Sequence, residues 1–267
     1  MLTTREEVER VGKLGVEVKP HAKGYACRML NRYWVIADTE DHGFTPHAKQ
    51  DGFWEAWITA WMARELSSDH IFVDVGANVG YYALFAASLG CRTVAYEPQH
   101  TLAERVAAAA DMNGWQQHLS VVNAAIGDKP GRMKLNIPRH HGMNASITHW
   151  GYTPSGEYTS YEVDVLPLDT LRQWMPNRPM LIKIDAEGAE PLVWAGMQEL
   201  LEREGKTTVL MEYRWDRYPD PMLFASQLFD QFLVSHVDYD AREVPLAGPF
   251  ALSSREHEDW MLVLRKP

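Results

Sequence analysis

The sequence contains little cysteine and no long apolar run. Only Cys27 and Cys91 are cysteines among its 267 residues. Two cysteines are too few for a disulfide framework, they show no CxxC spacing, and such usage is typical of a reducing compartment. The longest apolar stretches, such as Tyr81–Leu89, are well short of the roughly 20 residues that a membrane-spanning helix requires. We therefore expect neither a disulfide scaffold nor membrane insertion.

The N-terminus also lacks the apolar segment of a secretion signal. Its first 20 residues mix charges of both signs. They contain no apolar run of the roughly 7–15 residues that a signal peptide needs. We expect the protein to act in the cytoplasm.

Positive charge is in deficit as well. The chain has 26 Lys and Arg against 36 Asp and Glu, which gives a formal net charge of -10. A field of this sign repels phosphate backbones, so we expect no nucleic-acid partner. Hydrophobic residues make up 46% of the sequence and charged residues 23%, which is typical of a globular protein with a sizeable core.

Short β-branched runs alternate with helical stretches from about residue 71 onward. The runs Ile71–Val75, Thr93–Tyr96 and Leu119–Asn123 are predicted as strands. Gly80–Leu89 and Thr101–Met112, which lie between them, are predicted as helices. This β-α-β-α-β order predicts a parallel sheet with right-handed crossovers.

Residues 127–168 interrupt the alternation. Gly, Pro, His and Asn are frequent there, and the segments MKLNI and YEVDV are predicted as antiparallel edge strands of a small β-insertion. Helices near Asp169–Met175 and from Glu190 to Glu204 are expected after it. The later elements are predicted as strands at Leu181–Ile184, Thr208–Glu212, Leu233–Val237 and Trp260–Leu264 and a helix at Pro221–Phe232. About seven core strands then form one α/β domain over residues 66–267.

Residues 1–65 form an N-terminal extension to this domain. Within it, Trp54, Trp57 and Trp61 recur at helical spacing along a predicted helix, Gly52–Leu66. Aromatic residues on one helix face are typical of core packing or of an oligomer contact. We expect the extension to lie on the acceptor side of a catalytic domain or to make a homodimer contact.

The segment VDVGANVG joins a predicted strand to a predicted helix. Gly76 and Gly80 allow a sharp bend, and the helix N-terminus offers free N–H groups to a ligand. Asn78 stands where the second glycine of a GxGxxG dinucleotide fingerprint would let a pyrophosphate approach. The carboxylate of Asp74 would repel a diphosphate. We expect this glycine turn, including Ala77, to hold a ligand with a positive centre.

Polar residues follow the next two predicted strands. Glu97 comes about 20 residues after the glycine turn, where an acid can accept hydrogen bonds from both hydroxyls of a ribose. Asn123 and Ala124 follow the third strand and would lie over an adenine edge. The glycine turn and these three residues are the predicted cofactor-binding site.

A second group of charged residues ends the predicted strand Leu181–Ile184. Because side chains alternate along a strand, Lys183 and Asp185 share a face; they can pair, or Asp185 can point into the cleft. Asp185, Glu187 and Glu190 place three acids within six residues, which is costly unless they are solvated, paired or metal-bound. Glu190 is expected to interact with the dipole of the helix that begins there.

Together these segments resemble the FkbM family of S-adenosylmethionine-dependent methyltransferases. The resemblance rests on FVDVGANVGYY and IKIDAEGAEPLVWAGM, with VVNAAIGD, GMNASI, LDTL and VLMEY at compatible spacings over roughly residues 70–215. It implies a Rossmann-like class I methyltransferase fold with a seven-stranded, mostly parallel sheet. It also implies methyl transfer from S-adenosylmethionine, usually to oxygen, with acceptors among sugars, glycans and glycosylated natural products.

Methyl transfer to an alcohol needs a base or a metal ion to assist the hydroxyl. We expect Asp185 to be the base and Lys183 to hold it ionised by pairing. Glu187 and Glu212, at neighbouring strand ends, would bind the acceptor or, with Asp185, ligate Mg²⁺. The residues by themselves leave base and metal ligand as alternatives, with general-base catalysis slightly favoured.

Acceptor contacts are also expected in the β-insertion. The GMNASI segment contains Asn144 and Ser146 and follows His141. With Glu212, these residues are predicted to contact a small-molecule or glycan acceptor.

Two other classes of function stay open at this point. A nicotinamide-dependent oxidoreductase would use a similar fold, although Asn78 and Asp74 count against a bound pyrophosphate. A non-catalytic nucleotide-binding protein is the second alternative. It would have no need for Asp74, Glu97 and Asp185 as three acids facing one cleft.

Overall fold

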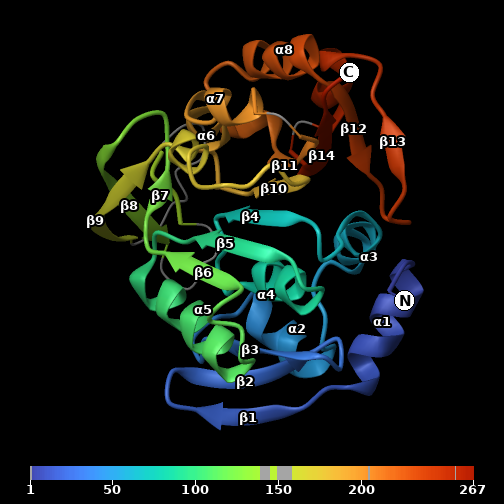
Figure 1. Ribbon diagram of the computed structural model, residues 1–267, viewed down its shortest axis with the longest axis vertical. Helices are drawn as coiled ribbons and strands as arrows, with labels where there is room; N and C mark the ends of the chain where they lie inside the picture. Colours follow the sequence, from blue (N-terminus) through green and yellow to red (C-terminus); the bar gives the residue numbers. More distant parts are fainter. Residues whose placement is uncertain (1, 139–144, 149–157, 204, 256) are drawn as a thin grey trace.

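An eight-stranded sheet forms the centre of the molecule, with helices on both faces (Figure 1). The computed structural model describes residues 2–138, 145–148, 158–203, 205–255 and 257–267. The strand order is β13-β12-β14-β11-β10-β4-β5-β6. The strands are β4 (Ile71–Val75), β5 (Arg92–Tyr96), β6 (Leu119–Val122), β10 (Met180–Ile184), β11 (Thr207–Tyr213), β12 (Leu233–Val237), β13 (Glu243–Pro245) and β14 (Trp260–Arg265).

The strand directions confirm the predicted fold class. Neighbouring strands from β6 to β11 run parallel, whereas β14 is antiparallel to both β11 and β12. The seven predicted core strands are present, and β13 adds a short strand at the edge. The chain is therefore an α/β protein with a mostly parallel central sheet.

The sheet is buried on both faces because apolar runs form its central strands. Every residue of β4 and β10 is buried, as is typical of parallel strands covered by helices. One face packs against α3 (Ala56–Glu65), α4 (Tyr81–Ser88) and α5 (His100–Met112). The other packs against α6 (Glu190–Ala195), α7 (Gln198–Leu201) and α8 (Pro221–Gln231).

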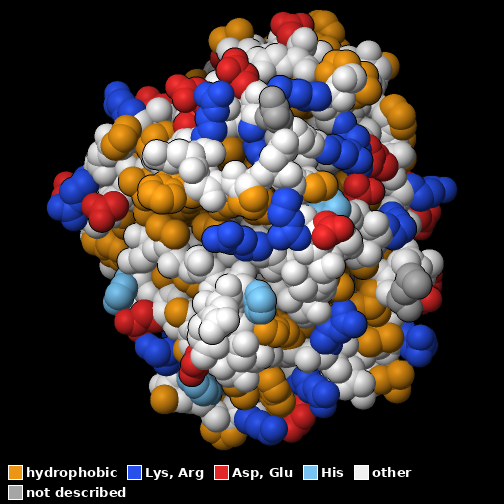
Figure 2. Space-filling view, in the orientation of Figure 1, with side chains coloured by type: hydrophobic (Ala, Val, Ile, Leu, Met, Phe, Trp, Pro, Cys, Tyr) orange, Lys and Arg blue, Asp and Glu red, His pale blue; other side chains and the backbone are white. Residues whose placement is uncertain are grey.

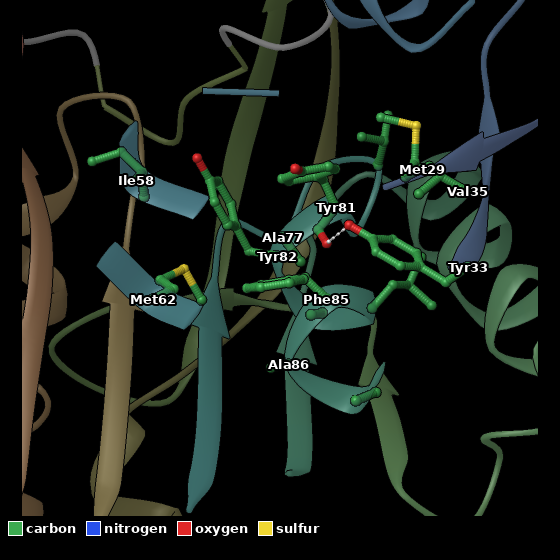
Figure 3. Close-up of a cluster of buried hydrophobic side chains, with 14 of the residues drawn as sticks. Met29, Tyr33, Val35, Ile58, Met62, Ala77, Tyr81, Tyr82, Phe85 and Ala86 are labelled. Carbon is green, nitrogen blue, oxygen red and sulfur yellow. Dashed lines mark hydrogen bonds between the residues drawn. The ribbon is translucent and has the colours of Figure 1, made fainter. Parts of the chain in front are cut away.

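The N-terminal extension folds onto the helices that follow the glycine turn (Figure 1). It consists of α1 (Arg5–Leu14), β1 (Val18–His21), β2 (Gly24–Met29), β3 (Tyr33–Ala37) and α2 (Phe44–Gln50), followed by α3. The three strands form an antiparallel sheet. Figure 3 shows Tyr33 beside Tyr81 and Phe85, with its hydroxyl donating to the Tyr81 carbonyl at 3.2 Å. The extension and α4 thus share one apolar core.

Helix α3 starts later than the sequence predicts. The residue before its first turn, Glu55, has a φ of 35°, and Gly52 has a φ of 67°. These left-handed conformations place the start of the helix at Ala56. Trp61 is buried in the core, whereas Trp54 and Trp57 are half-buried against it.

The predicted β-insertion is a separate three-stranded sheet. Strands β8 (Gly131–Pro138) and β9 (Tyr158–Leu166) pair antiparallel, as predicted, and β7 (Ala125–Ile126) pairs with β9. A small apolar core of its own includes Leu135 and Ile147. The insertion lies beside the carboxyl end of β5 in Figure 1.

Two helix predictions after the insertion were wrong. Only a short 3₁₀ turn, Leu168–Leu171, forms where a helix over Asp169–Met175 was expected, because the Asp169 side chain instead accepts the Leu200 N–H at 2.7 Å. The helix expected from Glu190 to Glu204 is divided into α6 and α7. The break lies at Gly196, whose carbonyl accepts the Asp169 N–H at 2.9 Å.

Cys27 and Cys91 are buried and free, and burial raises the pKa of each thiol to about 11. Among the described residues, no helix has the length and apolar character needed to cross a membrane.

Candidate functional site

A cavity of about 370 Å³ lies at the carboxyl ends of β4, β5, β10 and β11. This volume is within the usual range for small-molecule sites, and strand ends of open α/β sheets are where ligands bind. The lining includes Gly76 and Asn78 of the glycine turn, Glu97 after β5, and Asp185 after β10. We call this the first cavity.

Close packing inside the protein requires both glycines of the turn. Gly76 has a φ of +77°, and a Cβ added there would lie 1.9 Å from the carbonyl oxygen of Asp185. Gly80 has a φ of +78°, and its added Cβ would meet the side chain of Val106 at 2.8 Å. The space that a side chain at Gly76 would need is therefore occupied by the backbone that follows β10. The space that a side chain at Gly80 would need is occupied by Val106 of α5. Gly80 does not line the cavity.

Backbone donors of the glycine turn are already paired. The N–H groups of Gly76 and Ala77 donate to the Tyr96 carbonyl at 3.0 and 2.9 Å. The N–H of Asn78 donates to Oε2 of Glu97 at 2.7 Å. These three donors are not free to bind a pyrophosphate, which argues against a dinucleotide at this turn.

Glu97 and Asn78 both line the first cavity. Burial raises the pKa of Glu97 to about 7, although the Gln99 and Asn78 N–H groups favour its charged form. Each carboxylate oxygen accepts one of these bonds and keeps a second lone pair. The side-chain oxygen of Asn78 is buried and has no hydrogen-bond partner among the described residues.

The remaining predicted cofactor residues divide into two groups. Ala124 lines the cavity next to Ala125 and Ile126, which form an apolar wall. Asn123 lies outside the lining, and its amide donates to the carbonyls of Glu97 and Pro98 at 2.8 and 3.0 Å. It therefore positions the loop that carries Glu97.

Asp74 and Lys183 lie beneath the first cavity, not in its lining. They are register partners on β4 and β10, on the sheet face that α4 covers. Burial raises the pKa of Asp74 to about 6, and neither of its carboxylate oxygens has a hydrogen-bond partner among the described residues. Lys183 Nζ lies 2.9 Å from Asp185 Oδ2 and 4.9 Å from the ring centre of Tyr82.

The charge on Lys183 is maintained by its neighbours. Burial by itself lowers the pKa of Lys183, but the carboxylates of Asp185 and Asp74 raise it overall. The ammonium group thus stays charged and holds Asp185, whose side chain is 28% exposed at the cavity. Lys183 contacts the cavity only through Asp185.

The structure brings Asp185, Glu187 and Glu212 together. One carboxylate oxygen from each lies within 4.8 Å of the other two. The guanidinium of Arg217 lies 3.2 Å from Glu187 and also binds Glu212. Burial raises the pKa of both glutamates, and Arg217 opposes this effect. These oxygen atoms could ligate a divalent cation, but an arginine already pairs with two of the three acids.

Three charged residues of the first cavity were not predicted from the sequence. Glu55 precedes α3 and accepts a hydrogen bond from the Tyr82 hydroxyl. Arg217 follows β11, and Asp259, 3.5 Å from Arg217, precedes β14. A charged segment after Glu212 was the only sequence signal for Arg217. Glu55 belongs to no motif that could have indicated it.

The predicted acceptor residues of the β-insertion do not line the first cavity where they are described. Ser146 makes a backbone bridge to Asn136, and its hydroxyl lies 3.1 Å from that of Thr148. Its neighbours Ala145 and Ile147 line the cavity instead. His141 and Asn144 lie outside the described residues.

The first cavity carries an excess of acid. Among the described residues of its lining, there is one guanidinium, that of Arg217, and there are six carboxyl groups, which belong to Glu55, Glu97, Asp185, Glu187, Glu212 and Asp259. On the face of the molecule shown in Figure 2, acidic and basic side chains are interspersed. Such a cavity favours a ligand with positive charge and repels phosphates.

Residues 74–241 match the methyltransferase FkbM domain, which covers the first cavity except for its contributions from Trp54, Glu55 and Asp259. No curated protein matches the chain.

Solved structures resemble the chain at low identity. The methyltransferase FkbM from Methylobacillus flagellatus is 16% identical with a TM-score of 0.44, over 74% of this chain and 44% of that one. The chain thus spans less than half the length of this relative. An rRNA methylase from Streptococcus thermophilus is 12% identical with a TM-score of 0.41, over 78% and 93%. Magnesium protoporphyrin IX methyltransferase from Synechocystis, with bound SAM, is 10% identical with a TM-score of 0.44, over 80% and 78%.

Proposed function

Because this chain belongs to the FkbM methyltransferase family, we propose that it transfers a methyl group from S-adenosylmethionine to a hydroxyl of a sugar, glycan or glycosylated natural product. The observation that supports this most directly is the acidic first cavity at the glycine turn. S-adenosylmethionine supplies a methyl group on a positively charged sulfur, and it carries no phosphate. Its charge suits a cavity with six carboxyl groups and one guanidinium.

The residues of the first cavity fit the other parts of this cofactor. Glu97 would accept hydrogen bonds from the ribose hydroxyls through its remaining lone pairs. The unpartnered oxygen of Asn78 would accept one from an amino group. Ala125, Ile126 and Leu135 would cover the apolar face of the adenine.

Asp185 is the residue that we assign to removing the proton of the acceptor hydroxyl. Lys183 occupies its Oδ2, and no hydrogen bond to Oδ1 is made by another described side chain. A base in this position must lie within hydrogen-bond reach of the hydroxyl while the oxygen attacks the methyl carbon in line. Lys183 acts as a positioning residue, because it holds the carboxylate without touching the reacting atoms.

We propose that the reaction needs no metal ion. Arg217 supplies positive charge to Glu187 and Glu212, the two acids that would otherwise complete a cation site with Asp185. A metal ion would have to displace the guanidinium from both glutamates, at the cost of two ion pairs.

Calorimetric titration with S-adenosylhomocysteine tests the cofactor assignment, with NADH as the comparison ligand. We expect S-adenosylhomocysteine to bind with a stoichiometry of one and NADH to give no heat. Binding of NADH without binding of S-adenosylhomocysteine would contradict the proposal. Mass spectrometry of acceptor panels incubated with S-adenosylmethionine then identifies the product by the gain of one methyl group.

A further inference from the structure

A second cavity, of about 460 Å³, adjoins the first on the side of the C-terminal strands. It lies between the start of α3 and strands β12 and β14, which are neighbours in Figure 1. Glu55, Glu212 and Asp259 line both cavities. A molecule in the second cavity would therefore reach the methyl-transfer site past these three carboxyl groups.

Aromatic side chains form part of the second cavity. Trp57 and Tyr239 meet edge to face with ring centres 5.1 Å apart, and Tyr239 is 62% exposed. Trp260 packs edge to face against His236 at 5.0 Å. Trp260 is buried and Trp57 is half-buried, so Tyr239 offers most of the exposed ring surface. Such a surface binds apolar C–H groups, while nearby carboxylates accept hydrogen bonds from hydroxyl groups. Sugar rings offer both kinds of group.

The charges in the second cavity disfavour an anionic ligand. Of the described lining residues, Arg255 is the one Lys or Arg, and five carry carboxyl groups: Glu55, Glu212, Asp238, Glu258 and Asp259. Arg255 is already engaged, since it lies over the ring of Trp260 and 3.8 Å from Glu258. A phosphate or carboxylate on the ligand would meet net negative charge.

We propose that the second cavity binds the methyl acceptor as an uncharged, polyhydroxylated ring, a sugar residue that carries neither phosphate nor carboxylate. Its apolar face packs on Trp57 and Tyr239, and its reacting hydroxyl passes Glu55, Glu212 and Asp259 toward Asp185. This assignment rests on the proposed function. Of the predicted acceptor contacts it keeps Glu212, which lines the second cavity, and it replaces those in the β-insertion.

Indole N–H resonances of the full chain, with ¹⁵N-labelled tryptophan and saturating S-adenosylhomocysteine, test this proposal. Trp57→Phe and Trp260→Phe assign the two reporter signals. The ligands are the methyl glycosides of glucose, galactose and mannose, with glucose 1-phosphate and glucuronate as charged counterparts. We expect at least one neutral glycoside to shift the Trp57 and Trp260 signals. Trp174, an exposed residue outside both cavities, should not respond.

Two variants make the test quantitative. Tyr239→Ala should weaken binding of the neutral glycoside by about fivefold. Trp174→Ala removes a similarly exposed ring outside the cavities and should leave that affinity unchanged. The proposal is overturned if no neutral glycoside shifts the reporters, if the charged sugars bind equally well, or if Tyr239→Ala binds like the wild type.

Calorimetry with S-adenosylhomocysteine distinguishes a failure of the proposed function from a failure of the acceptor assignment. If S-adenosylhomocysteine gives no heat in calorimetry, the proposed function itself fails. If it binds while the glycosides leave the reporters unmoved, only the acceptor assignment fails.

Discussion

The two sides of the first cavity are built in different ways. On the glycine-turn side, backbone N–H groups of Gly76, Ala77 and Asn78 pair with Tyr96 and Glu97, all within one short stretch of chain. On the other side, carboxylates from distant segments meet around a single guanidinium. Backbone hydrogen bonds make the first side rigid without a ligand. The second side has more carboxyl groups than cationic groups among its described residues, an arrangement that suits a cationic ligand.

This difference separates stability from function. A side chain added at Gly76 would disturb the packing of the turn after β4 against the end of β10, because Gly76 directly abuts the Asp185 carbonyl. Buried carboxylates contribute little to stability unless they are paired, and several on the acidic side share one arginine. We therefore expect substitutions on the glycine-turn side to affect cofactor binding and folding, and substitutions on the acidic side to affect turnover.

The largest effect is expected from Gly76→Ala. Its Cβ would lie 1.9 Å from a carbonyl oxygen at a φ of +77°, so the turn must distort and S-adenosylhomocysteine binding should be abolished. Gly114→Ala is the matched control, since Gly114 has a φ of +73° with nothing within 4 Å. It should lose on the order of 1 kcal/mol in unfolding free energy and keep full binding. Calorimetry and denaturant unfolding measure both quantities, and normal binding by Gly76→Ala would contradict the packing argument.

Asp185→Asn tests the acidic side. We expect turnover to fall by about a hundredfold or more, because a positioned base is lost, while cofactor affinity stays near that of the wild type. Asp69→Asn, at a side chain that is 89% exposed near the other end of the sheet, should leave both unchanged. Single-turnover kinetics and calorimetry distinguish the two effects. Wild-type turnover in Asp185→Asn would remove this residue from the mechanism.

An intermediate effect is expected from pH, through Glu97. Hydrogen bonding to ribose requires the carboxylate, and its pKa of about 7 in the unliganded protein means that protonation competes below pH 7. Cofactor affinity at pH 6 should be about tenfold weaker than at pH 8. Glu97→Gln should bind weakly at both pH values. A wild-type affinity that is independent of pH would show that this carboxyl is not the ribose ligand.

The same raised pKa also affects the stability of the unliganded protein. The folded state holds the Glu97 proton more tightly than the unfolded chain does, where the pKa is 4.5. The protonated Glu97 side chain therefore contributes fully to the free energy of unfolding below pH 4.5, and this contribution is lost as the pH rises through about 7. Denaturant unfolding of wild type and Glu97→Gln over this range measures it.

The smallest effect is expected from removing metal ions. Because Arg217 pairs with Glu187 and Glu212, treatment with EDTA should leave turnover unchanged, and added Mg²⁺ should not raise it. Activity assays before and after chelation decide this. Loss of activity on chelation with recovery on adding Mg²⁺ would make the three carboxylates a metal site instead.

The sequence was sufficient to predict the strands and the positions of two site residues. β4 has the predicted bounds, and Glu97 and Asp185 line the cavity as expected from their places after β5 and β10. These features are local: a buried strand needs a continuous apolar run, and parallel strands bring their carboxyl ends to one edge. Helix α3 was predicted too long, because the left-handed φ of Glu55 depends on its surroundings.

Only the tertiary structure decided which side chains face the ligand. Asp74 belongs to the motif that suggested a cofactor, yet its direction on β4 places it beneath the cavity with Lys183. Glu55, Arg217 and Asp259 come from segments without a motif. Packing of α3 against the sheet brings Glu55 to the first cavity, and pairing of β14 with β11 brings Asp259 there. Local pattern thus determined where strands begin and end. The contacts between distant segments, which no short pattern encodes, determined the chemistry of the cavity.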